Sequence, residues 1–391
     1  MEAASIKLAD TNFTIDWLCE VLNESKENLI NWSASRIGKG HGFLSTIVAV
    51  ELKWQSEDKH LPNKVVLKIP NSTILSSVFA ERETAEEFVQ FVVTTHSLEC
   101  SSYEILKSWS NLPIPKMLHC RRIKPDQNGV LVMEKISDGV IANFADGLTE
   151  EQLYSVAESL AKLHAQSLTV DLSDWKRRFR AHDWLWKRLW INVTGNMIEA
   201  TATAVRKRHP ELFRKFLSGF FEQPKLADQS YEWSYHLHEQ LDMPPVVVHG
   251  DFWSQNVMFT SDLAGKAGPK LLGILDWQFA HLGNCMEDLC VLIISSCSAD
   301  LRRHHWRQVV GHYYSTLTML LHCHAPFSLE QLENAFHKTE RRGLLFLVMS
   351  SQVWPSIVGV NEENDFEKSV DSLVKRVENA ICDIWPQCIK A

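Results

Sequence analysis

The feature that most constrains this 391-residue chain is a set of polar residues placed directly after short apolar runs. His249, Gly250, Asp251 and Asn256 follow the first run, and Asp276 ends the second. Carboxylate and amide oxygens are the hard ligands that Mg²⁺ prefers, and a carboxylate can also accept the proton of an attacking hydroxyl. The spacing therefore predicts a phosphoryl-transfer site, since that reaction needs a base, metal ligands and phosphate contacts.

The spacing H-G-D-x-x-x-x-N differs at one fixed position from the H-R-D-x-x-x-x-N catalytic loop of protein kinases. Asp251 is predicted to be the catalytic base, and Asn256 and Asp276 to hold Mg²⁺. His249 is predicted to be a scaffold histidine that is hydrogen-bonded to the backbone. Asp288 is predicted to cap the next helix and to tie down the catalytic loop. A simple turn is the alternative for Asp251 and Asn256, but it leaves the strand-ending Asp276 unexplained.

Earlier residues are candidates for nucleotide binding. A glycine-rich segment could bring backbone amides to phosphates, or be a plain hairpin turn; its residues are Gly38, Gly40, Gly42 and Ser45. Lys68 ends the apolar run that follows and is predicted to contact the α and β phosphates. A buried lysine needs a carboxylate partner, and spacing alone does not choose among the six glutamates of the helical stretch 80–106. Met133 and Glu134 are predicted to contact an adenine edge, with a polar strand end as the alternative.

Periodicity predicts a β-rich first part and a mostly helical second part. For the first part we expect helices at 14–32 and 80–106 and strands at 43–53, 64–69 and 130–135. For the second part we expect a helix at 150–167, strands at 246–248, 257–259 and 271–275, a loop containing 265–269, and long helices after 300. The predicted fold class is α+β, a protein-kinase-like two-lobe fold with a small β-rich N-lobe, 1–135, and a large mostly helical C-lobe, 136–391.

Composition excludes several other classes. The net charge of −8 argues against a nucleic-acid partner, which would need a basic face. The nine cysteines contain no C-x-x-C pair, so neither a disulfide framework nor a zinc site is indicated. The first ten residues lack a secretory signal pattern, and no stretch approaches eighteen consecutive apolar residues. We therefore expect a cytoplasmic protein that has no membrane partner.

Tryptophan is abundant, with fourteen in the chain. Four of them crowd one short region: Trp175, Trp184, Trp186 and Trp190. Such a cluster at near-helical spacing is most often core, which is the favoured interpretation. The alternative is that these rings line a pocket for an apolar or cationic acceptor, because aromatic faces attract both.

The motif segments 249–256, 274–278 and 283–289 resemble the CHK kinase-like group, which includes the ecdysteroid kinase-like proteins. This group is related to choline kinases and aminoglycoside phosphotransferases. Segments 42–45, 112–116 and 160–165 are also similar to family segments, so the resemblance covers nearly the whole chain.

The resemblance implies an ATP- and Mg²⁺-dependent kinase that phosphorylates the hydroxyl of a small-molecule alcohol. It places the lysine-pairing glutamate at Glu99, although Leu98, Cys100 and Ser102 depart from the family pattern around it. Trp277 and Gln278 stand where protein kinases carry Phe-Gly, which favours a small-molecule acceptor over a protein. The sequence fixes neither the acceptor nor the oligomeric state.

Two rival interpretations have different chemistry. A pseudokinase would keep the fold and bind nucleotide as a scaffold, although all four key residues are present: Lys68, Asp251, Asn256 and Asp276. A metal-dependent hydrolase would use His249, Asp251, His281 and Asp276, and it would leave the residues before 136 without a role.

Overall fold

The computed structural model describes residues 6–37, 44–55, 61–71, 82–180, 183–322, 324–350 and 363–389. The chain forms two compact units. The first unit comprises Met1–Lys107 and Pro115–Ser137, and the second unit comprises Ser108–Ile114 and Asp138–Ala391. The proposed lobes 1–135 and 136–391 stay a prediction about domains.

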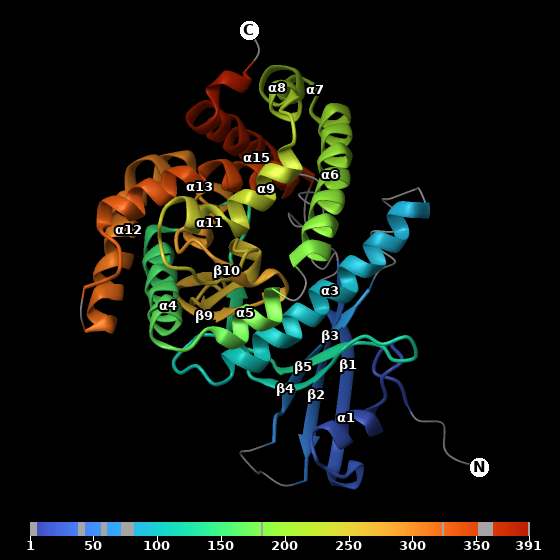
Figure 1. Cartoon of the computed structure of the whole chain (residues 1–391). Helices are drawn as coiled ribbons and strands as arrows, with labels where there is room; N and C mark the ends of the chain where they lie inside the picture. Colours follow the sequence, from blue (N-terminus) through green and yellow to red (C-terminus); the bar gives the residue numbers. More distant parts are fainter. Residues whose placement is uncertain are drawn as a thin grey trace. The chain divides into compact units, whose positions relative to one another are not determined.

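The first unit is built on a five-stranded antiparallel sheet with strand order β1-β2-β3-β5-β4 (Figure 1). Its strands are β1 (Leu29–Ile37), β2 (Ser45–Trp54), β3 (Lys64–Pro70), β4 (Met117–Arg121) and β5 (Val130–Glu134). Its helices are α1 (Ile15–Val21), the short 3₁₀ turn η1 (Lys26–Asn28) and α3 (Arg82–Leu106), which packs against β3 and β4. The strands expected at 43–53 and 64–69 are confirmed as β2 and β3, which pair antiparallel.

Alternation along β3 decides where Lys68 points. Leu67 is fully buried in the core cluster that also contains Val50, Val132 and the α1 residue Leu18. Because successive side chains of a strand point to opposite faces, Lys68 lies on the other face of the sheet. The core therefore fixes the side from which the Lys68 ammonium must find its partner.

The predicted helix 14–32 is wrong beyond its first turns. Thr14 caps its start, since the Thr14 Oγ1 accepts a hydrogen bond from Trp17 N at 3.2 Å. The helix ends at Val21, and Asn23 takes a left-handed conformation with φ 57°. Residues 29–37 instead form β1, because pairing with β2 satisfies their backbone groups. Sequence periodicity also missed β4, which pairs with β5.

The second unit is mostly helical, with two small sheets of order β6-β8-β9 and β10-β7 (Figure 1). The strands are β6 (Gly139–Ile141), β7 (Val246–Val248), β8 (Val257–Ser261), β9 (Ala267–Ile274) and β10 (His281–Gly283). The α-helices are α4 (Glu150–Thr169), α5 (Ser173–Arg180), α6 (Asp183–Arg208), α7 (Pro210–Leu212), α8 (Ser218–Phe221), α9 (Leu226–Tyr235), α10 (Leu237–Gln240), α11 (Glu287–Ser296), α12 (Ala299–Leu321), α13 (Leu329–Ser350) and α15 (Glu363–Ile384). The remaining short elements are the π-helix η2 (Phe213–Leu217) and the 3₁₀ turns η3 (Ser254–Asn256), η4 (Trp277–Phe279) and η5 (Pro386–Cys388).

Helix α11 lies at the centre of this unit. Every one of its residues is buried, and it packs against α13 and α4. A helix that is apolar all round can be buried in this way, but the first turn of α11 carries the acids Glu287 and Asp288. Since a buried charge is costly unless it is paired, these two carboxylates must find partners inside the unit.

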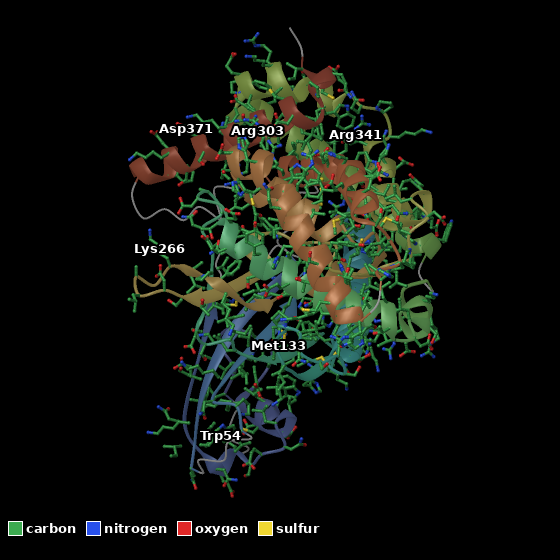
Figure 2. All side chains as sticks on the ribbon, turned by 90° about the vertical axis from the view of Figure 1, so that its left-hand side faces the viewer. Trp54, Met133, Lys266, Arg303, Arg341 and Asp371 are labelled. Carbon is green, nitrogen blue, oxygen red and sulfur yellow. The ribbon has the colours of Figure 1, made fainter. Side chains whose placement is uncertain are left out.

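The β8–β9 hairpin corrects one loop assignment. Gly268 and Pro269, expected in the connecting loop, belong to β9, while Gly265 lies in the turn with φ +76°. The Asp262 side chain accepts from the backbone of Lys266 at 2.8 Å, and Figure 2 shows Lys266 at the tip of this hairpin. Among the described helices, none combines the length and apolar character needed to cross a bilayer. The α+β fold class, β-rich and then mostly helical, is confirmed.

Candidate active site

The segment 249–256 leaves the buried strand β7 and is held by the imidazole of His249. The His249 Nε2 donates to the Leu275 carbonyl at 2.7 Å, and its Nδ1 accepts from the Asp251 backbone N–H at 3.3 Å. These two bonds require the tautomer with the proton on Nε2. The fully buried ring thus ties the Asp251 loop to the end of β9, as a scaffold does.

Asp251, Asn256 and Asp276 gather at this junction. The Asn256 Nδ2 donates to the Asp251 carbonyl at 2.8 Å and to the Asp251 Oδ2 at 3.1 Å. The Leu275 N–H donates to the Asn256 carbonyl at 2.8 Å, which places Asp276 one residue from that bond. Asp276 itself takes a left-handed conformation with φ 66°. The structure therefore brings these predicted site residues together on adjoining loops.

Asp288 binds the loop from behind and is not a helix cap. The cap position of α11 is Met286, and Asp288 lies in the first turn. Its carboxylate accepts from His249 N at 2.7 Å and from Gly250 N at 3.0 Å. Burial, with the neighbouring Glu287 carboxylate, raises the pKa of Asp288 to about 7, against the lowering effect of these two amides. The Asp288 carboxylate therefore binds the two loop amides and does not cap the N-terminus of α11.

Gly250 must be glycine, a point that the motif spacing did not show. Its φ is +80°, and a Cβ would lie 2.4 Å from the Phe279 carbonyl oxygen and 3.0 Å from the His281 Nδ1. The loop therefore lies directly against the segment that follows Asp276. A side chain here would have to push backbone away, which moves Asp251 with it.

Gly250→Ala is expected to lower turnover by about 10²-fold, because small displacements of a catalytic group cost that much. The matched control is Gly265→Ala, which has a similar φ of +76° but nothing within 4 Å of the added methyl group. Both variants carry the strain of a positive φ, about 1 to 3 kcal/mol. Thermal unfolding and turnover of both should be compared; equal activity of the two variants would contradict the expectation.

In the first unit, the structure chooses the partner of Lys68. The Lys68 Nζ lies 2.8 Å from the Glu99 Oε1, and the two side chains are 7% and 2% exposed. Glu104, one turn further along α3, instead forms a bidentate pair with Arg122. Among the glutamates of α3 whose side chains are described, Glu86 is exposed and Glu87 is half-buried. The buried pair is therefore the one that the family resemblance implied.

The structure describes only some of the other residues that were predicted to bind nucleotide. Gly38, Gly40 and Gly42 lie outside the described residues. Ser45 is nearly buried and begins β2. The amide of Glu134, at the end of β5 beside the Met133 labelled in Figure 2, donates to the Lys116 carbonyl at 2.9 Å. The amide of Lys135 donates to the Lys64 carbonyl at 3.0 Å. Adenine contact by Met133 and Glu134 stays a prediction.

The donor set suits magnesium better than a transition metal. The described residues contain no group of three or more His, Cys, Asp or Glu side chains that could hold a metal ion. Mg²⁺ is commonly held by one or two protein oxygens together with substrate phosphates. Asn256 uses its amide nitrogen to bind Asp251, so its side-chain carbonyl oxygen and the Asp276 carboxylate are the oxygen donors that could hold a cation. These two residues fit the ion that the sequence predicted.

The geometry disfavours the hydrolase interpretation. A histidine ligand needs a free ring nitrogen. Both nitrogens of His281 lie at backbone carbonyls, 2.9 Å from Phe279 and 3.0 Å from Ser234, and His249 uses both of its own. Neither ring offers a lone pair to a metal.

Three of the four clustered tryptophans are core, which was the favoured interpretation. Trp175, Trp186 and Trp190 are buried, whereas Trp184 is 76% exposed. Trp186 and Trp190 pack on Phe279, and the Trp186 Nε1 donates to the Tyr235 hydroxyl at 2.6 Å. Trp186 and Trp190 therefore support the chain that follows Asp276.

Comparison with known protein families shows to which family this chain belongs. A family model described as "DUF1679: Uncharacterized oxidoreductase dhs-27" matches residues 16–384. The chain belongs to the DUF1679 family. Two proteins of Caenorhabditis elegans are similar to this chain. The first is described as "Uncharacterized oxidoreductase dhs-27" and is 25% identical over 78% of this chain. The second is described as an uncharacterized kinase-like protein and is 23% identical over 70% of this chain. The resemblance to kinase-like proteins drawn from the sequence is confirmed.

The chain matches only part of the length of each relative. The chain spans 37% of the length of the first relative and 69% of the second. Among solved structures, a choline kinase from Cryptosporidium parvum is similar with a TM-score of 0.49 and 14% identity, covering 93% of each chain. A GDP complex of an aminoglycoside 2′-phosphotransferase has a TM-score of 0.46 and 15% identity, covering 91% of this chain and 93% of its own.

Proposed function

We propose that this protein is an ATP- and Mg²⁺-dependent kinase that transfers the γ-phosphate to the hydroxyl of a small-molecule alcohol. The observation that carries the proposal is the hydrogen-bonded assembly of Asp251, Asn256 and the residues leading to Asp276. In the first unit, the buried Lys68–Glu99 pair supplies a positioned cation for phosphates.

Each residue has a role in this proposal. Asp251 orients the acceptor hydroxyl and takes its proton, while the Asn256 bond to the Asp251 Oδ2 fixes the direction of that carboxylate. Asn256 and Asp276 hold the metal, which when bound spreads the negative charge of the transferring phosphoryl group. His249 and Asp288 keep the loop in shape through the bonds described above.

An oxidoreductase is less well supported. That description belongs to a relative of which this chain spans 37%. The present sequence contains no G-x-G-x-x-G fingerprint, the usual cradle for a dinucleotide pyrophosphate. The phosphotransfer residues, in contrast, are all present and gathered on adjoining loops in the second unit or paired in the first.

A metabolite screen tests the proposal. Purified full-length protein is incubated with small-molecule extract and ATP labelled at the γ-phosphate, with Mg²⁺ and with excess EDTA. We expect a labelled product that requires Mg²⁺. If nucleotide binds but no labelled product forms in any extract, the protein is a pseudokinase; if nucleotide does not bind at all, the kinase proposal is wrong.

A further inference from the structure

The catalytic loop is held from inside the second unit by residues that the motif does not contain. Arg342, on α13, donates from its Nη2 to the Gly250 carbonyl at 3.1 Å and from its Nε to the Ser234 Oγ at 2.9 Å. Asp288 already takes the Gly250 amide. Both peptide groups of Gly250 are therefore fixed by buried charged side chains, immediately before Asp251.

His281 lies against the same glycine. Its Nδ1 lies 3.0 Å from the place that a Cβ of Gly250 would take. The two ring nitrogens both face carbonyl oxygens, those of Phe279 and Ser234. A carbonyl only accepts hydrogen bonds, so both nitrogens must carry a proton to satisfy both contacts. The geometry thus requires a charged imidazolium, although the side chain is only 3% exposed.

Glu287 is the counter-charge for both cations. Its carboxylate lies 3.4 Å from the His281 Nε2 and 3.9 Å from the Arg342 Nε, and the side chain is 1% exposed. Within the described residues, neither of its oxygens has a well-formed hydrogen bond. A carboxylate buried in this way is costly by itself, so its benefit must come from the two charges that it balances.

We propose that Glu287 is a positioning residue: its buried carboxylate keeps Arg342 and a protonated His281 in place, and these two shape the Gly250 loop that carries Asp251. The catalytic part of this inference rests on the proposed kinase function. The charged state of His281 does not, so the two can be tested separately.

The expected pH dependence follows from the groups around His281. These are Glu287 and Asp288 on α11, Arg342 on α13, His238 on α10 and the Tyr235 ring on α9. Burial lowers the pKa of His281, but Glu287 and the carbonyl contact raise it more, so the net direction is upward. The stability that this proton contributes is complete below about 6.5, the unfolded value, and is lost as the pH rises through the folded value.

The first test follows the His281 proton. Full-length protein labelled with ¹⁵N-histidine is titrated by two-bond ¹H–¹⁵N NMR, with the urea-unfolded chain as reference. We expect one folded-state histidine with both nitrogens protonated that titrates above the unfolded value of about 6.5. In Glu287→Gln this signal should move to or below that value, because burial, the largest effect, is then opposed only by the carbonyl contact and Asp288. If no histidine of the wild type titrates above the reference, the proposal is overturned, whatever the activity.

The second test follows the loop. Glu287→Gln should lower kcat on the order of 10²-fold with an unchanged nucleotide KM. Glu239→Gln, an exposed glutamate nearby, is the matched control and should keep wild-type kcat. Arg342→Lys keeps the positive charge but loses the pair of hydrogen bonds to Gly250 and Ser234, so it should also lower kcat. A Glu287→Gln protein with unaltered kcat and pH profile would contradict the positioning role. A wild type without phosphotransfer would end the kinase proposal and leave the NMR result to decide the charged network.

Discussion

Asp251→Asn is expected to remove phosphotransfer almost completely, with kcat lower by about 10³-fold. The amide keeps the size of the side chain and can still accept a hydrogen bond from Asn256, but it cannot take the proton of the acceptor hydroxyl. Nucleotide affinity should change little, because the proposed phosphate contact comes from Lys68. The labelled product of the metabolite screen and a direct nucleotide titration measure the two quantities.

The control for this variant is Asp242→Asn. Asp242 is an exposed aspartate of the same unit whose left-handed backbone, φ 52°, asparagine also tolerates. It should behave as the wild type in both assays. Full phosphotransfer by Asp251→Asn, with Asp242→Asn unaffected, would mean that another group is the base.

Glu99→Gln is expected to destabilise the first unit by about 3 kcal/mol, because removal of one partner leaves the buried Lys68 ammonium without its counter-charge. It should also weaken nucleotide binding. Glu104→Gln is the matched control on the same helix. Its partner Arg122 has a side chain that is 38% exposed, so we expect a loss of at most about 1 kcal/mol. Urea denaturation measures both, and equal losses would contradict the special burial of Glu99.

A double variant separates stability from function. Lys68→Met with Glu99→Leu replaces the buried ion pair by apolar groups of similar size, a change that is often neutral or stabilising. We expect denaturation close to that of the wild type, together with loss of nucleotide binding. A double variant that still bound nucleotide with full affinity would show that Lys68 does not contact phosphates.

A helix or strand was predictable from the sequence wherever the residues that stabilise it lie close together along the chain. The strands β2 and β3, the helix α3 and the capped helix α4 follow from alternation, periodicity and capping residues. The prediction of one helix over 14–32 was wrong because the spacing of its apolar residues fits both a helix and a strand. The pairing of β1 with β2 decided between them, and that contact is not visible in a local window.

The sequence by itself determined which residues form the candidate site, since the spacing of Asp251, Asn256 and Asp276 puts them on neighbouring loops; their roles as base and metal ligands are our proposal. Spacing alone did not choose the glutamate that meets Lys68; the family resemblance implied Glu99, and the tertiary structure shows that pair. Only the tertiary structure decided which residues hold the loop. Arg342 reaches Gly250 across 92 residues of sequence, so no local pattern reports the contact. Its physical reason is burial: a charge inside a packed unit is stable only beside its partners, and packing alone brings them together.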